Sequence, residues 1–193
     1  MKEYNELVII IDRSGSMYHL KDDVVGGFNS LIEEQKKDGD TLVTTVFFNT
    51  NVKFIHERED IKNIKTLDKR SYQPGGCTAL LDAVGDSIAY IKSKHASLKE
   101  DELPKHTIVS IMTDGLENAS REYSYKKIKE MIELQKKCGW DFIFQAANID
   151  TIKEAERLGI DRDLADSFHA SKRGVQLSMC VMSKKIDKLK KKR

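Results

Sequence analysis

Three separate segments of the chain carry oxygen-bearing side chains that could bind a divalent cation. The residues are Asp12, Ser14 and Ser16 of a D-x-S-x-S run, Thr78 of a glycine-flanked loop, and Asp114 of a T-D-G segment. Two carboxylates and three hydroxyls form an all-oxygen set, which suits Mg²⁺, Mn²⁺ or Ca²⁺ and disfavours zinc. The five histidines show no ligand spacing. We therefore predict that these residues bind a divalent cation, with Mg²⁺ favoured.

The charge of such a site indicates what it would do. Two carboxylates at most neutralise a dication, and neutral hydroxyls leave it a strong Lewis acid. Mg²⁺ normally keeps some waters in its shell, so an exchangeable position remains. A carboxylate is a natural occupant of that position. The ligand set therefore predicts a docking site for a Glu or Asp side chain of a partner protein.

The rest of the chain alternates between apolar runs and helical periods, which is typical of βα units. Residues 7–11 are apolar at five successive positions, as expected for a strand covered on both faces. Further strands are expected at residues 42–48, 52–56, 107–113, 140–147 and 164–169, and helices at 22–35, 78–91, 128–135, 150–158 and 171–192. Gly26-Gly27 inside the first helix indicates a close approach of its backbone to the sheet.

These elements predict an α/β fold with a doubly wound, Rossmann-like sheet of six mostly parallel strands and helices on both faces. The tight turn at residues 49–51 makes strand 52–56 antiparallel and places it at an edge of the sheet. Right-handed crossovers and a reversal of strand order set the first strand beside the strand that ends before Asp114. Asp12 and Asp114 should then meet at the carboxyl ends of neighbouring strands.

The five residues and their order resemble the von Willebrand factor type A (vWA) domain and its metal-ion-dependent adhesion site (MIDAS). The family pattern is D-x-S-x-S, then a threonine in a glycine-flanked loop, then an aspartate in a T-D-G segment. The resemblance implies that the hydroxyls contact the ion directly or through water, that one or both aspartates act through water, and that a partner's Glu or Asp completes the shell. The chain is similar to short intracellular bacterial or phage members, which implies a role in a cytoplasmic assembly or stress-response complex.

Composition agrees with an intracellular domain. The chain has 193 residues, of which 33% are charged and 39% hydrophobic, and this length fits one α/β domain. No apolar run approaches the roughly 18–20 residues that cross a bilayer. Cys77, Cys138 and Cys180 are widely spaced and form no C-x-x-C motif, which favours reduced thiols. We therefore expect a cytoplasmic protein without a membrane span.

The charge of +2 is unevenly distributed, because residues 183–193 contain seven Lys or Arg and one Asp. We divide the chain into a vWA domain at 1–183 and a basic C-terminal tail at 184–193. Lysines at the end of a helix favour its negative dipole end, which is the simpler interpretation. Binding of nucleic acid through this tail is an alternative function.

The motif residues could also have a purely structural role, or they could serve catalysis. Asp12 and Ser14 could form a turn, Thr78 could cap a helix, and Asp114 could belong to an ordinary turn. A Mg²⁺-dependent phosphatase or hydrolase is the enzymatic alternative, but position 14 is a serine where aspartyl-phosphate phosphatases need a second aspartate. Neither a P-loop nor a G-x-S-x-G motif is present. The sequence therefore predicts a binding module and not an enzyme.

Three polar residues lie beside the motif segments in the sequence. Glu117 and Asn118 follow Asp114 closely, and we expect them to be solvated loop residues. Asn148 follows a predicted strand, and we expect it to cap the next helix.

Overall fold

The computed structural model describes residues 3–191 and contains one sheet of six strands in the order β3-β2-β1-β4-β5-β6. The strands are β1 (Asn5–Asp12), β2 (Thr41–Phe48), β3 (Val52–Asp60), β4 (His106–Thr113), β5 (Trp140–Ala146) and β6 (Ala165–Ser167). All neighbours pair in parallel except β2 and β3, which are antiparallel. The strand order reverses at β1, which lies between β2 and β4. The predicted fold class, including the antiparallel edge strand, is confirmed.

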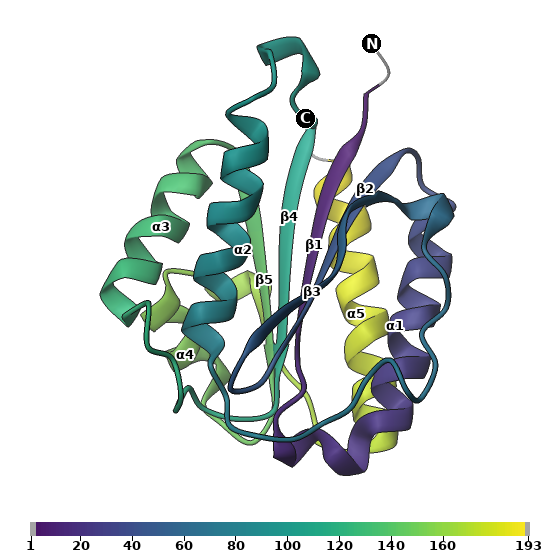
Figure 1. The fold of residues 1–193 in the computed structure, drawn as a ribbon, viewed down its shortest axis with the longest axis vertical. Coiled ribbons are helices and arrows are strands. Elements are labelled where there is room, and N and C mark those ends of the chain that lie inside the picture. Colours follow the sequence, from purple (N-terminus) through teal and green to yellow (C-terminus); the bar gives the residue numbers. More distant parts are fainter. Residues whose placement is uncertain (1–2, 192–193) are drawn as a thin grey trace.

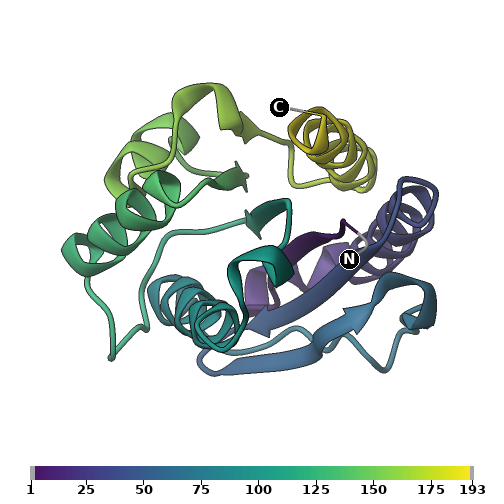
Figure 2. The ribbon, with the colours of Figure 1, turned by 90° about the horizontal axis from the view of Figure 1, so that it is seen from above.

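Within residues 3–191, five α-helices cover the two faces of the sheet. They are α1 (Lys21–Gln35), α2 (Leu80–His95), α3 (Tyr125–Lys137), α4 (Thr151–Leu158) and α5 (Lys172–Lys190). Helices α1 and α5 lie on one face, and α2, α3 and α4 lie on the other (Figures 1 and 2). A short 3₁₀ helix at Gly15–Leu20 joins β1 to α1.

Strand β1 is buried because both faces of the sheet are covered. Leu7, Ile9 and Ile11 pack in the core beneath α1 and α5. Val8 and Ile10 pack in the second core, beneath α2, α3 and α4. Side chains alternate between the faces of a strand, so a continuous apolar run is what two cores require. Burying each of these side chains stabilises the fold by about 1.5–3 kcal/mol.

Helix α1 approaches α5 closely at Gly27. A Cβ atom at Gly27 would lie 2.8 Å from Cγ of Met179, whereas one at Gly26 would meet nothing within 4 Å. The prediction that this glycine pair lets the helix approach the sheet is therefore wrong. The contact that needs glycine is between two helices, and only one of the two glycines takes part.

Helix α5 continues beyond residue 184 and packs on the domain. Ile186 and Leu189 are buried in the core with α1. The Lys190 ammonium donates hydrogen bonds to Gln35 Oε1 at 2.7 Å and to Thr41 Oγ1 at 3.3 Å. Residues 184–191 of the basic segment thus belong to the helix or its end, and 192–193 lie outside the described residues. Within residues 3–191, no helix is both long and apolar enough to cross a bilayer.

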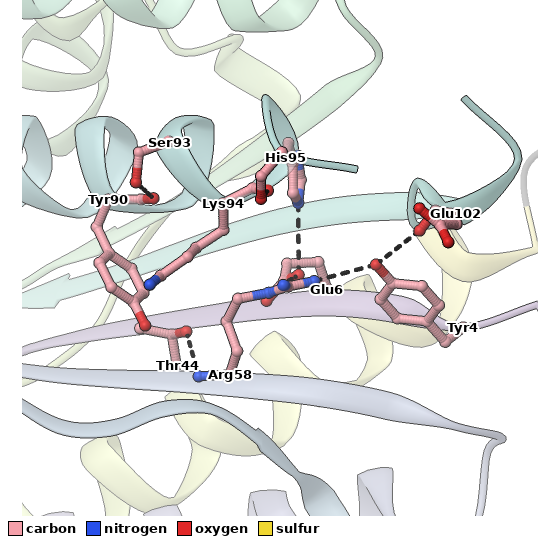
Figure 3. Close-up of polar contacts among 10 residues, drawn as sticks. Tyr4, Glu6, Thr44, Arg58, Tyr90, Ser93, Lys94, His95 and Glu102 are labelled. Carbon is pink, nitrogen blue, oxygen red and sulfur yellow. Dashed lines mark hydrogen bonds and ion pairs between the residues drawn. The ribbon is translucent and has the colours of Figure 1, made fainter. Parts of the chain in front are cut away.

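A buried ion pair between Glu6 and Arg58 lies near the amino end of β1 (Figure 3). The predicted metal site is at the other end of this strand. The Glu6 side chain has no solvent exposure, and its Oε2 atom lies 2.8 Å from Nε of Arg58 and 3.4 Å from Nε2 of His95. Nη2 of Arg58 also donates to the Tyr4 hydroxyl at 3.0 Å. Arg58 has a left-handed backbone with a φ of 50°, next to an irregularity in the β2–β3 pairing. The Glu6 Oε1 atom is buried and has no hydrogen-bond partner among the described residues.

Candidate metal centre

Asp12 is the last residue of β1, and its side chain is completely buried. Its Oδ1 atom accepts a hydrogen bond from the backbone N–H of Ser14 at 2.6 Å. Its Oδ2 atom accepts one from the hydroxyl of Thr113, the last residue of the neighbouring strand β4, at 2.6 Å. Asp12 is therefore held both by its own loop and by the next strand. The bond between Asp12 Oδ1 and the Ser14 N–H closes a turn, which is the structural role that the sequence left open for Asp12.

The D-x-S-x-S loop contacts the T-D-G segment directly. The hydroxyls of Ser14 and Ser16 lie 3.0 Å apart. The Ser16 hydroxyl donates a hydrogen bond to Asp114 Oδ1 at 2.5 Å, across 98 positions of sequence. The carboxyl ends of β1 and β4 meet where the strand order reverses, so the structure brings these two predicted segments together.

The loop that contains Thr78 is bonded to the D-x-S-x-S loop through the backbone. The N–H of Gly15 donates to the Gly76 carbonyl at 3.0 Å, and the N–H of Gly75 donates to the Arg13 carbonyl at 2.9 Å. Thr78 itself is buried. The N-cap position of α2 is Ala79, which forms no side-chain cap. Thr78 therefore lies at the same end of the sheet as the other four residues and does not cap the helix.

The electrostatics of the site fit a cation. Burial raises the pKa of Asp12 above its ordinary value, and the negative charge of Asp114 adds to the rise. Hydrogen bonds from Thr113 and Ser14 oppose it. The Asp114 Oδ2 atom is buried and has no hydrogen-bond partner among the described residues. A buried carboxylate oxygen without a partner is costly, and a bound cation would remove that cost.

The donor set also limits the kind of cation. Within residues 3–191, no three His, Cys, Asp or Glu side chains come together as a metal-binding cluster. A cation at this end of the sheet would therefore need the hydroxyls of Ser14, Ser16 and Thr78 beside the two carboxylates. Hydroxyl and carboxylate oxygens are hard ligands, the kind that Mg²⁺, Mn²⁺ and Ca²⁺ take in proteins.

Two supporting residues were not identified from the sequence. The buried hydroxyl of Tyr72 donates a hydrogen bond to the backbone carbonyl of Asp12. Burial raises the pKa of Tyr72 well above its ordinary value, and the charges of Asp12 and Asp114 contribute to the rise. The Thr113 hydroxyl orients Asp12 by donating a hydrogen bond to it. The position of Thr113 in the T-D-G segment is a sequence signal that could have identified this role. No comparable sequence signal marked Tyr72.

The predictions about three neighbouring polar residues are incomplete for Glu117 and Asn118, which do lie in a loop, and wrong for Asn148. The side chains of Glu117 and Asn118 are bonded to backbone N–H groups, including that of Thr78, and are not merely solvated. Asn148 does not cap α4, because the capping side chain belongs to Asp150. Asn148 has a left-handed backbone with a φ of 60°, and its side chain donates to the Asp114 carbonyl at 3.3 Å. All three residues support the site.

Comparison with known proteins gives matches only among solved structures, since no protein-family model and no curated protein matches the chain. The PilB minor pilin from Streptococcus sanguinis matches 97% of this chain over 62% of its own, with a TM-score of 0.68 and 13% identity. The vWF domain of the type V pili tip protein Mfa5 from Porphyromonas gingivalis matches 100% of this chain over 98% of its own, with a TM-score of 0.67 and 9% identity.

Proximal thread matrix protein 1 (PTMP1) from the mussel byssus, with zinc in its MIDAS motif, matches 96% of this chain over 46% of its own. Its TM-score is 0.64 and its identity 14%. The chain thus spans less than two thirds of PilB and of PTMP1. These likenesses show that the chain has a vWA-like fold, as its motifs predicted. They give no support for the intracellular type.

Proposed function

We propose that this chain is a metal-dependent protein-binding module. The predicted ligands are Asp12, Ser14, Ser16, Thr78 and Asp114. The observation that supports the proposal best is the buried Oδ2 atom of Asp114, which has no hydrogen-bond partner within residues 3–191. The other oxygen of Asp114 accepts a hydrogen bond from the Ser16 hydroxyl. When bound, a cation such as Mg²⁺ would offer a Lewis-acidic position to an incoming Glu or Asp of a partner protein.

The residues of the chain have separable roles in this proposal. Asp12 is oriented by Thr113 and by the Ser14 backbone, so its carboxylate is fixed before any ligand arrives. The Ser16 hydroxyl bridges Ser14 and Asp114, which keeps the two loops in contact. A site that is held in place in this way loses little conformational entropy on binding.

Binding is a better proposal than catalysis. The hydroxyls of Ser14 and Ser16 bond to each other, and that of Ser16 also donates to Asp114. Neither hydroxyl is paired with a histidine in the part of the chain that the structure describes. A serine nucleophile normally has a general base within hydrogen-bond reach. The matched proteins include a minor pilin, a pilus-tip protein and a byssus matrix protein with zinc at its MIDAS. By analogy with these proteins, we propose that this chain also serves an assembly.

We also propose that the protein works in a reducing compartment, the cytoplasm, as part of an assembly or stress-response complex. The support is that Cys77, Cys138 and Cys180 are all free and exposed. The described part of the basic segment, residues 184–191, is proposed to stabilise the domain and not to bind nucleic acid. Its support is the burial of Ile186 and Leu189 on that stretch of α5.

Thermal unfolding with and without Mg²⁺ tests the metal site. A ligand at 100 times its dissociation constant stabilises the folded state by about 2.7 kcal/mol. For a domain of this size that corresponds to a rise in melting temperature of about 5–11 °C. Asp114→Ala should abolish the rise, and Asp101→Ala, at an exposed acidic residue of the Glu100–Glu102 3₁₀ helix, should keep it. An equal rise in wild type and Asp114→Ala would contradict the assignment.

Affinity capture tests the docking function. Wild-type protein is used as bait in native lysate with Mg²⁺ or with EDTA, and Asp114→Ala is used with Mg²⁺. A partner retained by wild type only with Mg²⁺, and lost with Asp114→Ala, is the expected result. A partner that Asp114→Ala retains as well as wild type would refute docking through the metal.

A further inference from the structure

The loops that bear Thr78 and Asp114 are tied together by Asn118. The backbone N–H of Asn118 donates to the Thr78 carbonyl at 3.0 Å. Its side-chain Oδ1 accepts the Thr78 N–H at 2.9 Å. Both backbone groups of Thr78 are therefore bonded to one residue, which lies four positions after Asp114. The relative position of these two predicted ligands depends directly on that pair of bonds.

The neighbouring residue, Glu117, joins the same loop to helix α2. Its carboxylate accepts hydrogen bonds from the N–H groups of Leu81, Ala119 and Ser120 at 3.0, 2.8 and 2.7 Å, and from the Ser120 hydroxyl at 2.7 Å. Leu81 lies in the first turn of α2, whose N-cap residue provides no side-chain cap. Glu117 thus supplies the missing cap from a distant loop, where negative charge is favourable.

Helix α2 binds the loop in return. The carboxylate of Asp82 accepts hydrogen bonds from the N–H groups of Arg121, Glu122 and Tyr123 at 2.9, 3.0 and 3.0 Å. The Asp82 N–H donates to the Ser120 hydroxyl at 3.0 Å. The segment after Asp114 is therefore fastened to the start of α2 at several successive residues. Because these hydrogen bonds hold the loop at several residues, the loop resists movements that would change the distance between Thr78 and Asp114.

We propose that Glu117 and Asn118 are positioning residues that hold Thr78 and Asp114 at a fixed separation, so that the site selects Mg²⁺ over Ca²⁺. Mg²⁺ requires near-octahedral ligands at about 2.0–2.1 Å, whereas Ca²⁺ accepts flexible geometry at about 2.3–2.6 Å. Loops that cannot move apart favour the smaller ion. Loops that have been loosened still accommodate the larger one. This inference rests on the proposed metal site.

Titration calorimetry of Mg²⁺ and Ca²⁺ with Asn118→Ala tests the inference. The substitution removes the side-chain oxygen that accepts the Thr78 N–H and leaves the bond from the backbone N–H of residue 118 to the Thr78 carbonyl. Loss of such a supporting contact costs about 10–100-fold in metal affinity, and we expect that loss for Mg²⁺ with a clearly smaller one for Ca²⁺. Asn118→Asp keeps the accepting oxygen and should retain the preference for Mg²⁺. Leu116→Ala, at an exposed residue of the same loop, should change neither affinity.

The ratio of the two affinities separates positioning from a general loss of stability. A structural defect alone would weaken the binding of both ions alike and leave the ratio of their affinities unchanged. An unchanged ratio in Asn118→Ala, with or without equal losses of affinity, would therefore overturn the inference. Ser120→Ala, which removes one hydroxyl from the same network, provides a milder test if Asn118→Ala does not fold, and the same shift in ratio is expected. Wild type that binds neither ion would refute the metal site itself.

Discussion

Replacement of Arg58 by Met should strongly destabilise the fold, because it leaves a charge in the interior. Glu6 is fully buried, and Arg58 Nε at 2.8 Å is its nearest ionic partner. His95 is farther away at 3.4 Å, and the second Glu6 oxygen has no partner in the described chain. Breaking a buried pair from one side costs about 3–5 kcal/mol. Methionine keeps the β-carbon, so the strain of the left-handed backbone is the same in both proteins.

Urea and thermal unfolding measure this cost. A loss of 3–5 kcal/mol corresponds to a melting temperature lower by about 6–20 °C in a domain of this size. The double variant Glu6→Leu with Arg58→Met removes both charges and should recover most of the loss. Lys69→Met breaks an exposed pair with Asp22 and should cost far less, because water screens exposed ion pairs. If Arg58→Met were as mild as Lys69→Met, the buried carboxylate would not depend on the guanidinium, and the reasoning would fail.

Two further changes test the packing of α1 and the protonation of a histidine. Gly26→Ala should raise the free energy of unfolding, measured with urea, by up to about 1 kcal/mol. Gly27→Ala should show no such gain, because its Cβ would meet Met179. Equal gains in the two variants would count against this close contact. Burial lowers the pKa of His56, so its contribution to stability is complete above about pH 6.5 and is lost as the pH falls through the lower folded pKa. His56→Gln should therefore reduce the fall in urea midpoint between pH 7 and pH 5, and an unchanged fall would exclude His56 as its source.

The sequence predicted the elements whose periodicity is set by two-sided burial. Strand β1 is an example, since each of residues 7–11 faces one of the two cores. Strand β3 was predicted to end at His56 but reaches Asp60. The irregular pairing near Arg58, whose backbone is left-handed, interrupts the alternation that would have revealed the longer strand.

The predicted site residues were identified from spacing, but their supports were not. Asn118 and Glu117 bond to backbone groups of Thr78 and of Leu81 in α2, which lie 40 and 36 positions away, and backbone partners leave no trace in the sequence of those segments. Asn148 and Asp150 are both good capping residues, and only the path of the chain decides that Asp150 caps α4. Sequence therefore indicated which side chains could bind a cation, and the structure supplied what holds them.

Strand β1 has a carboxylate at each end, and this feature bears on how the sheet finds its register. A slip of two residues, about 6.6 Å along the strand, keeps the alternation of side chains, so the apolar run alone does not exclude it. The same slip would separate Asp12 from Thr113 and Glu6 from Arg58 at the same time. Both carboxylates would then lose these partners, and the one that moves inward along the strand would be buried without them. The carboxylates near the two ends of β1 therefore specify the pairing register of the apolar residues between them.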